Sequence, residues 1–175
     1  MLVGARLVLV PLTSLDARRL LAGLGGLAFA ESYPSTFATE VLRLVAEFPS
    51  ESDAPLGPWL ITRCLDDVVV GVLNCARMAE RSTVTVGYEV APSCAGQGYA
   101  TEALRTLVEH LLARPEVSRV CADTVVDHVA SRRVMEKAGL RWQRDDVEER
   151  DGREVTLAHY AVDHLGRGAG RRQPR

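Results

Sequence analysis

The chain has 175 residues, of which 47% are hydrophobic and 25% charged, so it can fold as one globular domain with a sizeable core. Its formal net charge of −2 argues against a protein that binds nucleic acid mainly by neutralising phosphates. Its apolar runs are shorter than the ~18 residues of a membrane span, and the N-terminus has the pattern of a strand rather than a signal peptide. We therefore expect one domain that binds neither nucleic acid nor a membrane.

The first half of the chain predicts one strand and two helices. Residues 6–11 alternate as a strand does, and a helix over residues 15–22 would be capped by Ser14 and ended by the glycines that follow. That helix would bury three leucines: Leu20, Leu21 and Leu24. A second helix, over residues 36–48, would bury one stripe of side chains: Val41, Leu42, Leu44, Val45 and Phe48.

The middle of the chain predicts an antiparallel meander. Its strands cover residues 59–64, 68–76 and 83–90, and a turn at Asp66-Asp67 joins the first two. In the third strand, valines alternate with polar residues, as they do in a strand with one buried face.

A glycine-rich stretch, Ala95-Gly96-Gln97-Gly98, lies between the third of these strands and a helical pattern that stops at Pro115. The first turn of a helix leaves backbone N–H groups without partners, beside the positive end of the helix dipole. Glycines allow a ligand to approach such a backbone closely. We interpret the stretch as an anion cradle, the alternative being a turn with no ligand.

Two other phosphate-binding loops do not match this spacing. A Walker-type loop needs Gly-Lys followed by Ser or Thr, and the only lysine of the chain is Lys137. A dinucleotide fingerprint needs a third small residue where Thr101 stands. Neither nucleotide motif is therefore expected.

The C-terminal part predicts three elements: a strand over residues 118–125, a helix over residues 130–138, and a hairpin of strands 141–149 and 154–162. The hairpin would turn at Asp151-Gly152. We expect the domain to cover residues 1–165 and a glycine- and arginine-rich tail to cover residues 166–175.

Three stretches carry a family resemblance: G-Y-E-V-A-P from Gly87, A-G-Q-G-Y-A-T-E-A from Ala95, and S-R-R-V-M-E-K-A-G-L from Ser131. Together they resemble the GNAT-type acyl-CoA N-acetyltransferases, and within these the ribosomal-protein N-terminal acetyltransferases. The resemblance implies an α+β fold, a single domain with a mixed, mostly antiparallel sheet of about seven strands flanked by about four helices. The central strands would splay apart to hold acetyl-CoA.

The resemblance also implies an activity. The enzyme would move an acetyl group from acetyl-CoA to a primary amine by direct transfer in a ternary complex, with no metal. The amine would be a protein N-terminus or a small molecule such as an amino acid, a polyamine or an aminoglycoside. The alternative is an acyl-CoA-binding regulatory or sensor module of the same fold with little or no turnover. Because related domains often pair through their C-terminal strands, a homodimer is expected.

By the same resemblance, acetyl-CoA would contact the glycine stretch, the end of the strand before it and the start of the helix over residues 130–138. The implied cofactor-binding residues are Val90, Ala95, Gly96, Gln97, Gly98, Tyr99, Ala100, Thr101, His128 and Ser131. Within this set, the backbone N–H of Val90 would polarise the thioester oxygen. The alternative for Ser131 is a plain N-terminal helix cap.

Catalysis at such a site needs a base that removes a proton from the amine. Glu89 is the best candidate because it lies at the end of the central strand beside Val90, the alternative being a solvated edge carboxylate. Ser131 and His128 complete the catalytic set, since histidine can act as an acid or a base near neutral pH. Tyr33 and Glu89 would contact the acceptor, although Tyr33 could equally be an aromatic cover over the core.

Three positions depart from the family's pattern. Ala95 stands where relatives carry Arg or Gln, which removes one side-chain contact to the pyrophosphate, and His128 stands in place of Asn. Met135 occupies a position where some members carry a tyrosine that acts as an acid, and methionine cannot donate that proton. Tyr160 could donate to the thiolate instead, but an inward-facing core tyrosine is the expectation.

The four cysteines, Cys64, Cys75, Cys94 and Cys121, lie in or beside apolar strand-like runs. They show neither C-x-x-C pairing nor zinc-ligand spacing with the histidines. We expect free, buried thiols in a reducing cytoplasm and no metal site.

Overall fold

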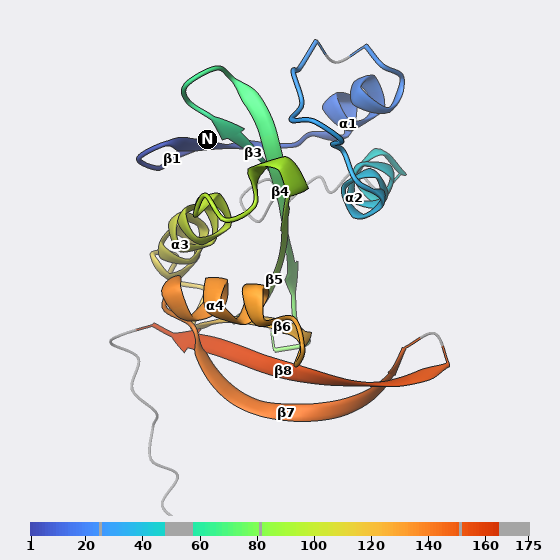
Figure 1. Ribbon diagram of the computed structural model, residues 1–175. Coiled ribbons are helices and arrows are strands. Elements are labelled where there is room, and N and C mark those ends of the chain that lie inside the picture. The colour runs from blue at the N-terminus through green and yellow to red at the C-terminus, as the bar shows by residue number, and fades with distance from the viewer. Residues whose placement is uncertain (25, 48–57, 81, 151, 165–175) are drawn as a thin grey trace, which may run out of the picture.

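The computed structural model describes residues 1–24, 26–47, 58–80, 82–150 and 152–164 (Figure 1). Gly25, Phe48, Asp151 and the predicted tail at residues 166–175 lie outside the described residues. In these described ranges, eight strands form one sheet in the order β1-β2-β3-β4-β5-β6-β8-β7. They are β1 (Leu2–Val3), β2 (Leu7–Pro11), β3 (Trp59–Arg63), β4 (Val68–Arg77), β5 (Thr83–Val90), β6 (Arg119–Val125), β7 (Arg141–Arg150) and β8 (Arg153–Asp163).

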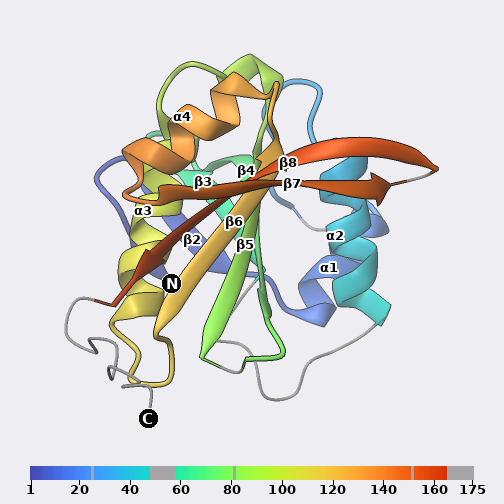
Figure 2. The ribbon, with the colours of Figure 1, turned by 90° about the horizontal axis from the view of Figure 1, so that it is seen from below.

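Within the described residues, four α-helices flank this sheet, two on each side (Figure 2). They are α1 (Ser14–Leu21), α2 (Thr36–Glu47), α3 (Tyr99–Leu112) and α4 (Val129–Lys137). Helices α1 and α2 lie together on one side, and α3 and α4 lie on the other (Figure 2). A short 3₁₀ turn, η1 (Pro92–Cys94), connects β5 to the glycine stretch. The predicted α+β class and mostly antiparallel sheet are confirmed, and the short edge strand β1 brings the strand number to eight.

The two central strands, β5 and β6, form the parallel pair of the sheet. They pair over three positions only, which are Thr83↔Arg119, Val84↔Val120 and Thr85↔Cys121. Beyond Thr85 the strands diverge, while β5 stays paired with β4 up to Val90 and β6 stays paired with β8 up to Val125. The predicted splay is therefore confirmed, and it leaves one edge of β5 without a strand partner.

The cap of α1 differs from the prediction. Thr13 is the N-cap: its hydroxyl accepts a hydrogen bond from the Asp16 N–H at 3.1 Å, and the Asp16 carboxylate accepts one from the Thr13 N–H at 3.3 Å. This reciprocal capping box places Ser14 inside the first turn, so the assignment of Ser14 as the cap is wrong. The helix buries Ala17, whereas Leu21 and Leu24 are exposed, so the expected burial of these two leucines is also wrong.

The buried face of α2 follows strict helical spacing. Ala38, Val41 and Leu42 are buried and Val45 packs against the core, which are positions i, i+3, i+4 and i+7 of one stripe. Successive residues of a helix are rotated by about 100°, so Leu44 lies off that stripe. It is 55% exposed, and the prediction that it is buried is wrong.

Candidate active site

The glycine stretch forms an open backbone cradle at the start of α3. Gly96 and Gly98 have φ angles of 74° and 81°, in the left-handed region that glycine adopts at little cost. Gly98 is the N-cap of α3 and supplies no side-chain hydrogen bond, so the N–H groups of the first turn remain available to a ligand. Apart from its chain neighbours, no heavy atom of the described residues lies within 4 Å of the point where a Cβ would stand on Gly96, so this side of the cradle is open.

Arg6, from the N-terminal part of the chain, contacts this cradle and the first turn of α3. Its Nη1 donates to the Gln97 carbonyl oxygen at 3.0 Å, and its Nε donates to Glu102 Oε2 at 2.8 Å. Its guanidinium also lies over the ring of Tyr99, 4.9 Å from the centroid. Arg6 thereby neutralises the carboxylate in the first turn of α3. The sequence analysis missed this residue, because only the pairing of distant strands brings it to the loop.

A cavity of about 410 Å³ lies between the cradle, the end of β5 and helix α4. It is lined by every predicted cofactor-binding residue except Gln97. The side chain of Gln97 instead donates to the Ser93 carbonyl oxygen at 3.3 Å. Arg133 and Lys137 of α4 also line the cavity and were not singled out from the sequence. Their spacing of four residues, which places both on one helix face beyond Ser131, is the signal that could have identified them.

The divergence of β5 and β6 leaves the backbone N–H of Val90 facing the cavity side of β5. The N–H of Ala91 donates to the Val70 carbonyl oxygen at 2.8 Å. Because the backbone groups of successive strand residues point to opposite edges, the N–H of Val90 points away from β4, toward the edge left open by β6. Gly71 of β4 makes the close pairing possible, since a Cβ there would collide with the backbone of Glu89.

Glu89 lies between the cavity and the N-terminus of α2. It lines the cavity, and its Oε2 accepts a hydrogen bond from the Ser35 hydroxyl at 2.7 Å. It is only partly exposed, and it lies where β5 has no partner strand on one side. Ser35 was not identified from the sequence, where it reads as an ordinary residue before a helix.

Tyr33 lies beside this carboxylate but does not line the cavity. Its side chain is 8% exposed, and its ring centroid lies 6.2 Å from that of Phe29. The hydroxyl has no hydrogen-bond partner among the described residues. Burial, with the charge of Glu89 as the second cause, raises the pKa of Tyr33. The ring thus covers part of the core, and the buried hydroxyl does not reach the cavity.

Tyr88 of β5 connects this strand to the start of α4. The Tyr88 hydroxyl donates to the Ser131 carbonyl oxygen at 3.0 Å and lies 2.8 Å from the Ser131 hydroxyl. The N-cap position is occupied by His128, so the alternative assignment of Ser131 as the cap is wrong. The His128 side chain makes no capping bond, and its Nδ1 lies 3.4 Å from Thr124 Oγ1. Burial raises the pKa of Tyr88 to about 12, so its hydroxyl stays protonated near neutral pH.

The two positions considered for a proton donor to the thiolate lie in the core. Met135 and Tyr160 are each 1% exposed. The Tyr160 hydroxyl accepts from Arg132 Nε at 3.0 Å and donates to Glu136 Oε1 at 3.1 Å. Tyr160 is therefore the inward-facing core tyrosine that the sequence predicts.

The four cysteines are free thiols, but their burial differs. Cys94 is buried and Cys75 and Cys121 are half-buried, whereas Cys64 is exposed, so the expectation of four buried thiols is wrong for Cys64. Within the described part of the chain, no three His, Cys, Asp or Glu side chains are grouped so that they could hold a metal ion. In the same residues, no helix combines the length and apolar character needed to cross a bilayer.

Comparison with known proteins identifies the fold. Residues 6–141 match the acetyltransferase (GNAT) domain family. The chain belongs to this family. No curated protein matches this GNAT domain.

Solved structures share the GNAT architecture over almost the whole chain. An acetyltransferase of the GNAT family from Bacillus anthracis has a TM-score of 0.70 at 17% identity, with 93% of this chain and 98% of that chain covered. A chimeric spermidine N-acetyltransferase from Vibrio cholerae has a TM-score of 0.68 at 16% identity, with 91% and 96% covered. A ribosomal α-N-protein acetyltransferase in complex with coenzyme A has a TM-score of 0.66 at 21% identity, with 92% and 96% covered. At these identities the likeness establishes the fold of this GNAT domain.

The cavity of the GNAT domain fits a thioester that carries phosphates. The cradle offers unpaired N–H donors and an open approach at Gly96, and Arg133 and Lys137 add positive charge. The unpaired edge of β5 offers backbone groups to an amide-containing chain. These features are the ones by which a coenzyme A thioester can be held.

Proposed function

We propose that this GNAT domain is an acetyl-CoA-dependent N-acetyltransferase that moves an acetyl group directly to a primary amine in a ternary complex. The observation that carries the proposal is the single cavity in which an anion cradle, the open edge of β5 at Val90 and the carboxylate of Glu89 come together. An anion site alone would explain the first of these features. A thioester placed beside a base explains all three.

In this proposal, the loop from Ala95 to Thr101 binds the pyrophosphate through backbone N–H groups. Arg133 binds the phosphates through its planar guanidinium and Lys137 binds them as a point charge, while the pantetheine arm lies along the open edge of β5. These two cations compensate in part for the side-chain contact to the pyrophosphate that Ala95 cannot make. His128 and Ser131 contact the thiol end, where Tyr88 holds the Ser131 hydroxyl.

The amine nitrogen loses two protons, one before and one after its attack, and the leaving sulfur gains one. Glu89 removes a proton from the ammonium group, the neutral amine attacks the thioester carbon, and the Val90 N–H stabilises the charge that develops on the oxygen. The carbon–sulfur bond breaks, the nitrogen gives up its second proton, and this proton passes through Ser131 or His128 to the thiolate. No metal is required for any of these steps.

The acceptor is a protein N-terminus or a small-molecule amine. The structural relatives include proteins named as acting on spermidine and on a ribosomal protein. Glu89 would contact this acceptor, whereas the buried hydroxyl of Tyr33 lies outside the cavity. An α-amine with a reference pKa of ~8 is easier to deprotonate near neutral pH than an alkylamine near ~10.4. The acceptor and the strength of the base are therefore linked.

The second candidate is an acyl-CoA-binding regulatory module with little turnover. Two observations favour it: Ala95 cannot make the side-chain contact of its relatives, and Met135, buried in the core, cannot donate a proton. Both candidates bind acetyl-CoA, so only release of the coenzyme A thiol in the presence of an amine separates them.

Acetyl-CoA is expected to stabilise the domain against heat. A ligand that binds only the native state at 100 times its Kd adds about 2.7 kcal/mol. For a chain of this size, that is a rise in Tm of about 5–11 °C. A thermal-shift titration measures it, with pantetheine, which lacks the diphosphate, as a control that should give a smaller shift. A flat response at millimolar acetyl-CoA would remove the basis of the proposal.

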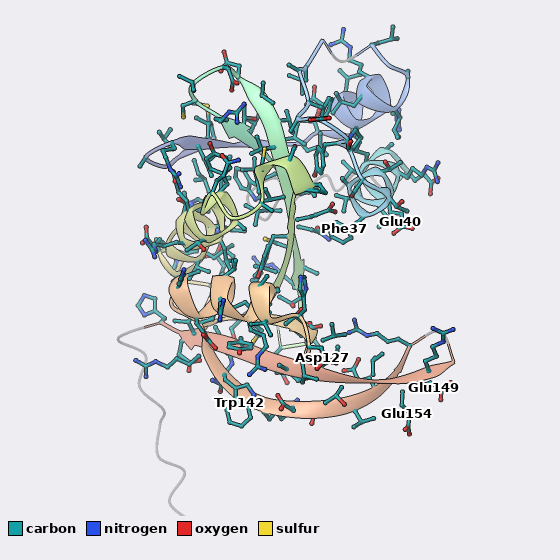
Figure 3. The ribbon with its side chains drawn as sticks, in the orientation of Figure 1. Phe37, Glu40, Asp127, Trp142, Glu149 and Glu154 are labelled. Carbon is teal, nitrogen blue, oxygen red and sulfur yellow. The ribbon has the colours of Figure 1, made fainter. Side chains whose placement is uncertain are left out.

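A homodimer through the C-terminal strands is part of the proposal. Strand β7 is an edge strand of the sheet, and it exposes Trp142 by 53% and Val147 by 65%. Trp142 points away from the helices (Figure 3). Sedimentation at micromolar concentration should give twice the mass of the chain, and Trp142→Glu should halve it. A monomer in the unmodified protein would contradict this pairing.

A further inference from the structure

Ser35 makes two hydrogen bonds that join helix α2 to Glu89. Its hydroxyl oxygen accepts from the Ala38 N–H at 3.1 Å, and its hydroxyl proton is donated to Glu89 Oε2 at 2.7 Å. The Ser35 carbonyl oxygen accepts from the Thr39 N–H at 2.9 Å, so Ser35 is the N-cap of α2. A hydroxyl has one proton, and the capping bond uses only a lone pair. The proton is therefore free to point at the carboxylate.

This arrangement gives the two carboxylate oxygens of Glu89 different hydrogen bonding. Oε2 is held by Ser35, whereas Oε1 has no hydrogen-bond partner among the described residues. The Glu89 side chain also lines the cavity proposed for the thioester. A hydrogen bond that fixes one oxygen restricts the rotation of the carboxylate and leaves the other oxygen to accept a proton from the amine.

The segment that carries Ser35 is attached to the sheet. The Ala30 N–H donates to the Val69 carbonyl oxygen at 2.9 Å, and the Val69 N–H donates to the Ala28 carbonyl oxygen at 2.8 Å. On its other side, the Ser93 hydroxyl donates to the Glu31 carbonyl oxygen at 3.2 Å. Ser35 is thus placed by β4, η1 and α2 together, which is the kind of support that a precisely oriented base requires.

We infer that Ser35 is a positioning residue, which orients the Glu89 carboxylate for proton removal through its hydroxyl while it caps α2. The inference rests on the proposed function, in which Glu89 is the base. It predicts that the hydroxyl affects the rate of transfer rather than the binding of acetyl-CoA. In this inference, the N-terminus of α2 helps to orient the carboxylate that takes the proton from the amine.

Two substitutions separate the positioning role from the capping role. Glycine is nearly as good an N-cap as serine, so Ser35→Gly removes the hydroxyl with little loss of helix stability. Ser35→Thr keeps the hydroxyl and serves as the matched control. Turnover is measured as release of the coenzyme A thiol, with spermidine or a short peptide with a free α-amine, whichever is the faster acceptor. We expect Ser35→Gly to lower kcat about tenfold with an unchanged KM for acetyl-CoA, and Ser35→Thr to retain the wild-type kcat within about threefold.

The same measurement in a Glu89→Gln background tests whether Ser35 acts through Glu89. If it does, adding Ser35→Gly to Glu89→Gln lowers kcat no further. A tenfold loss that persists in this background, or a wild-type kcat in Ser35→Gly, overturns the inference and leaves the proposed function standing. A wild-type kcat in Glu89→Gln alone overturns the assignment of the base, and no thiol release by the unmodified protein with either amine overturns the proposed function itself.

Discussion

Replacing Gly98 by aspartate is expected to lower the affinity for acetyl-CoA at least tenfold, which corresponds to about 1.4 kcal/mol. The substitution adds a carboxylate at the N-cap of α3, where the proposed pyrophosphate meets unpaired N–H groups. Two negative groups in contact repel each other, and the new side chain narrows the cradle. Isothermal titration with acetyl-CoA measures the loss.

The fold should tolerate this change. Gly98 has a φ of 81°, and Asp and Asn are the side chains that accept left-handed backbone most readily. A Cβ at this position would meet only Arg6 Nη2, at 3.4 Å, and that atom is the flexible end of a side chain. Gly98→Asn is the matched control, because it has the same shape without the charge and should lose less affinity. Unchanged affinity in Gly98→Asp would mean that the loop is only a turn.

Replacing Glu89 by glutamine is expected to lower turnover by ~10²–10⁴-fold, the range typical of a positioned acid or base. Glutamine keeps the size of the side chain and can still accept a hydrogen bond from Ser35, but it cannot take a proton from an ammonium group. Affinity for acetyl-CoA should stay nearly unchanged. Steady-state kinetics with a saturating amine measures the effect as a loss in kcat.

Glu40→Gln is the control for the loss of a negative charge near α2. Glu40 projects from α2, is exposed, and is not one of the residues that line the cavity of the proposed site (Figure 3). Its substitution should leave kcat at the wild-type level. A Glu89→Gln variant that loses less than about threefold, with the wild-type pH profile, would assign the proton transfer to another group, with His128 as the next candidate.

The glycine cradle could be predicted from the sequence because its causes are local. Strand alternation before Gly96, glycines at two positions and helical spacing after Gly98 all lie within a short segment. The structure contains the expected strand Thr83–Val90 and places the helix from Tyr99 to Leu112. The predicted splay rested on the family resemblance, since local spacing carries no information about where two distant strands separate.

The residues that support the candidate site could not be predicted in this way. Arg6, Ser35 and Tyr88 contact partners 96, 54 and 43 positions away along the chain, at Glu102, Glu89 and Ser131. Hydrophobic periodicity indicates which face of an element is buried, but it does not indicate which polar side chains meet across the fold.

The errors at the N-terminal helices have a different cause. Thr13 and Ser14 are both good N-cap residues, and the decision depends on the Asp16 carboxylate, which reaches back to Thr13 and not to Ser14. For Leu44, hydrophobicity alone suggested burial, whereas the phase set by Ala38, Val41 and Leu42 excludes it. A small residue such as Ala38 is easily overlooked as part of a buried stripe.

The central claim is that this GNAT domain transfers acetyl groups to amines, and mass spectrometry of the acceptor tests it most directly. The protein is incubated with acetyl-CoA and a panel of amines that includes spermidine, amino acids, an aminoglycoside and peptides with a free N-terminus. Our account predicts that at least one amine gains a single acetyl group, in step with release of the coenzyme A thiol, and that Glu89→Gln suppresses both. If acetyl-CoA binds and raises the Tm while no amine across the panel is acetylated, the account of this domain as an enzyme is contradicted, and the acyl-CoA-binding regulatory module takes its place.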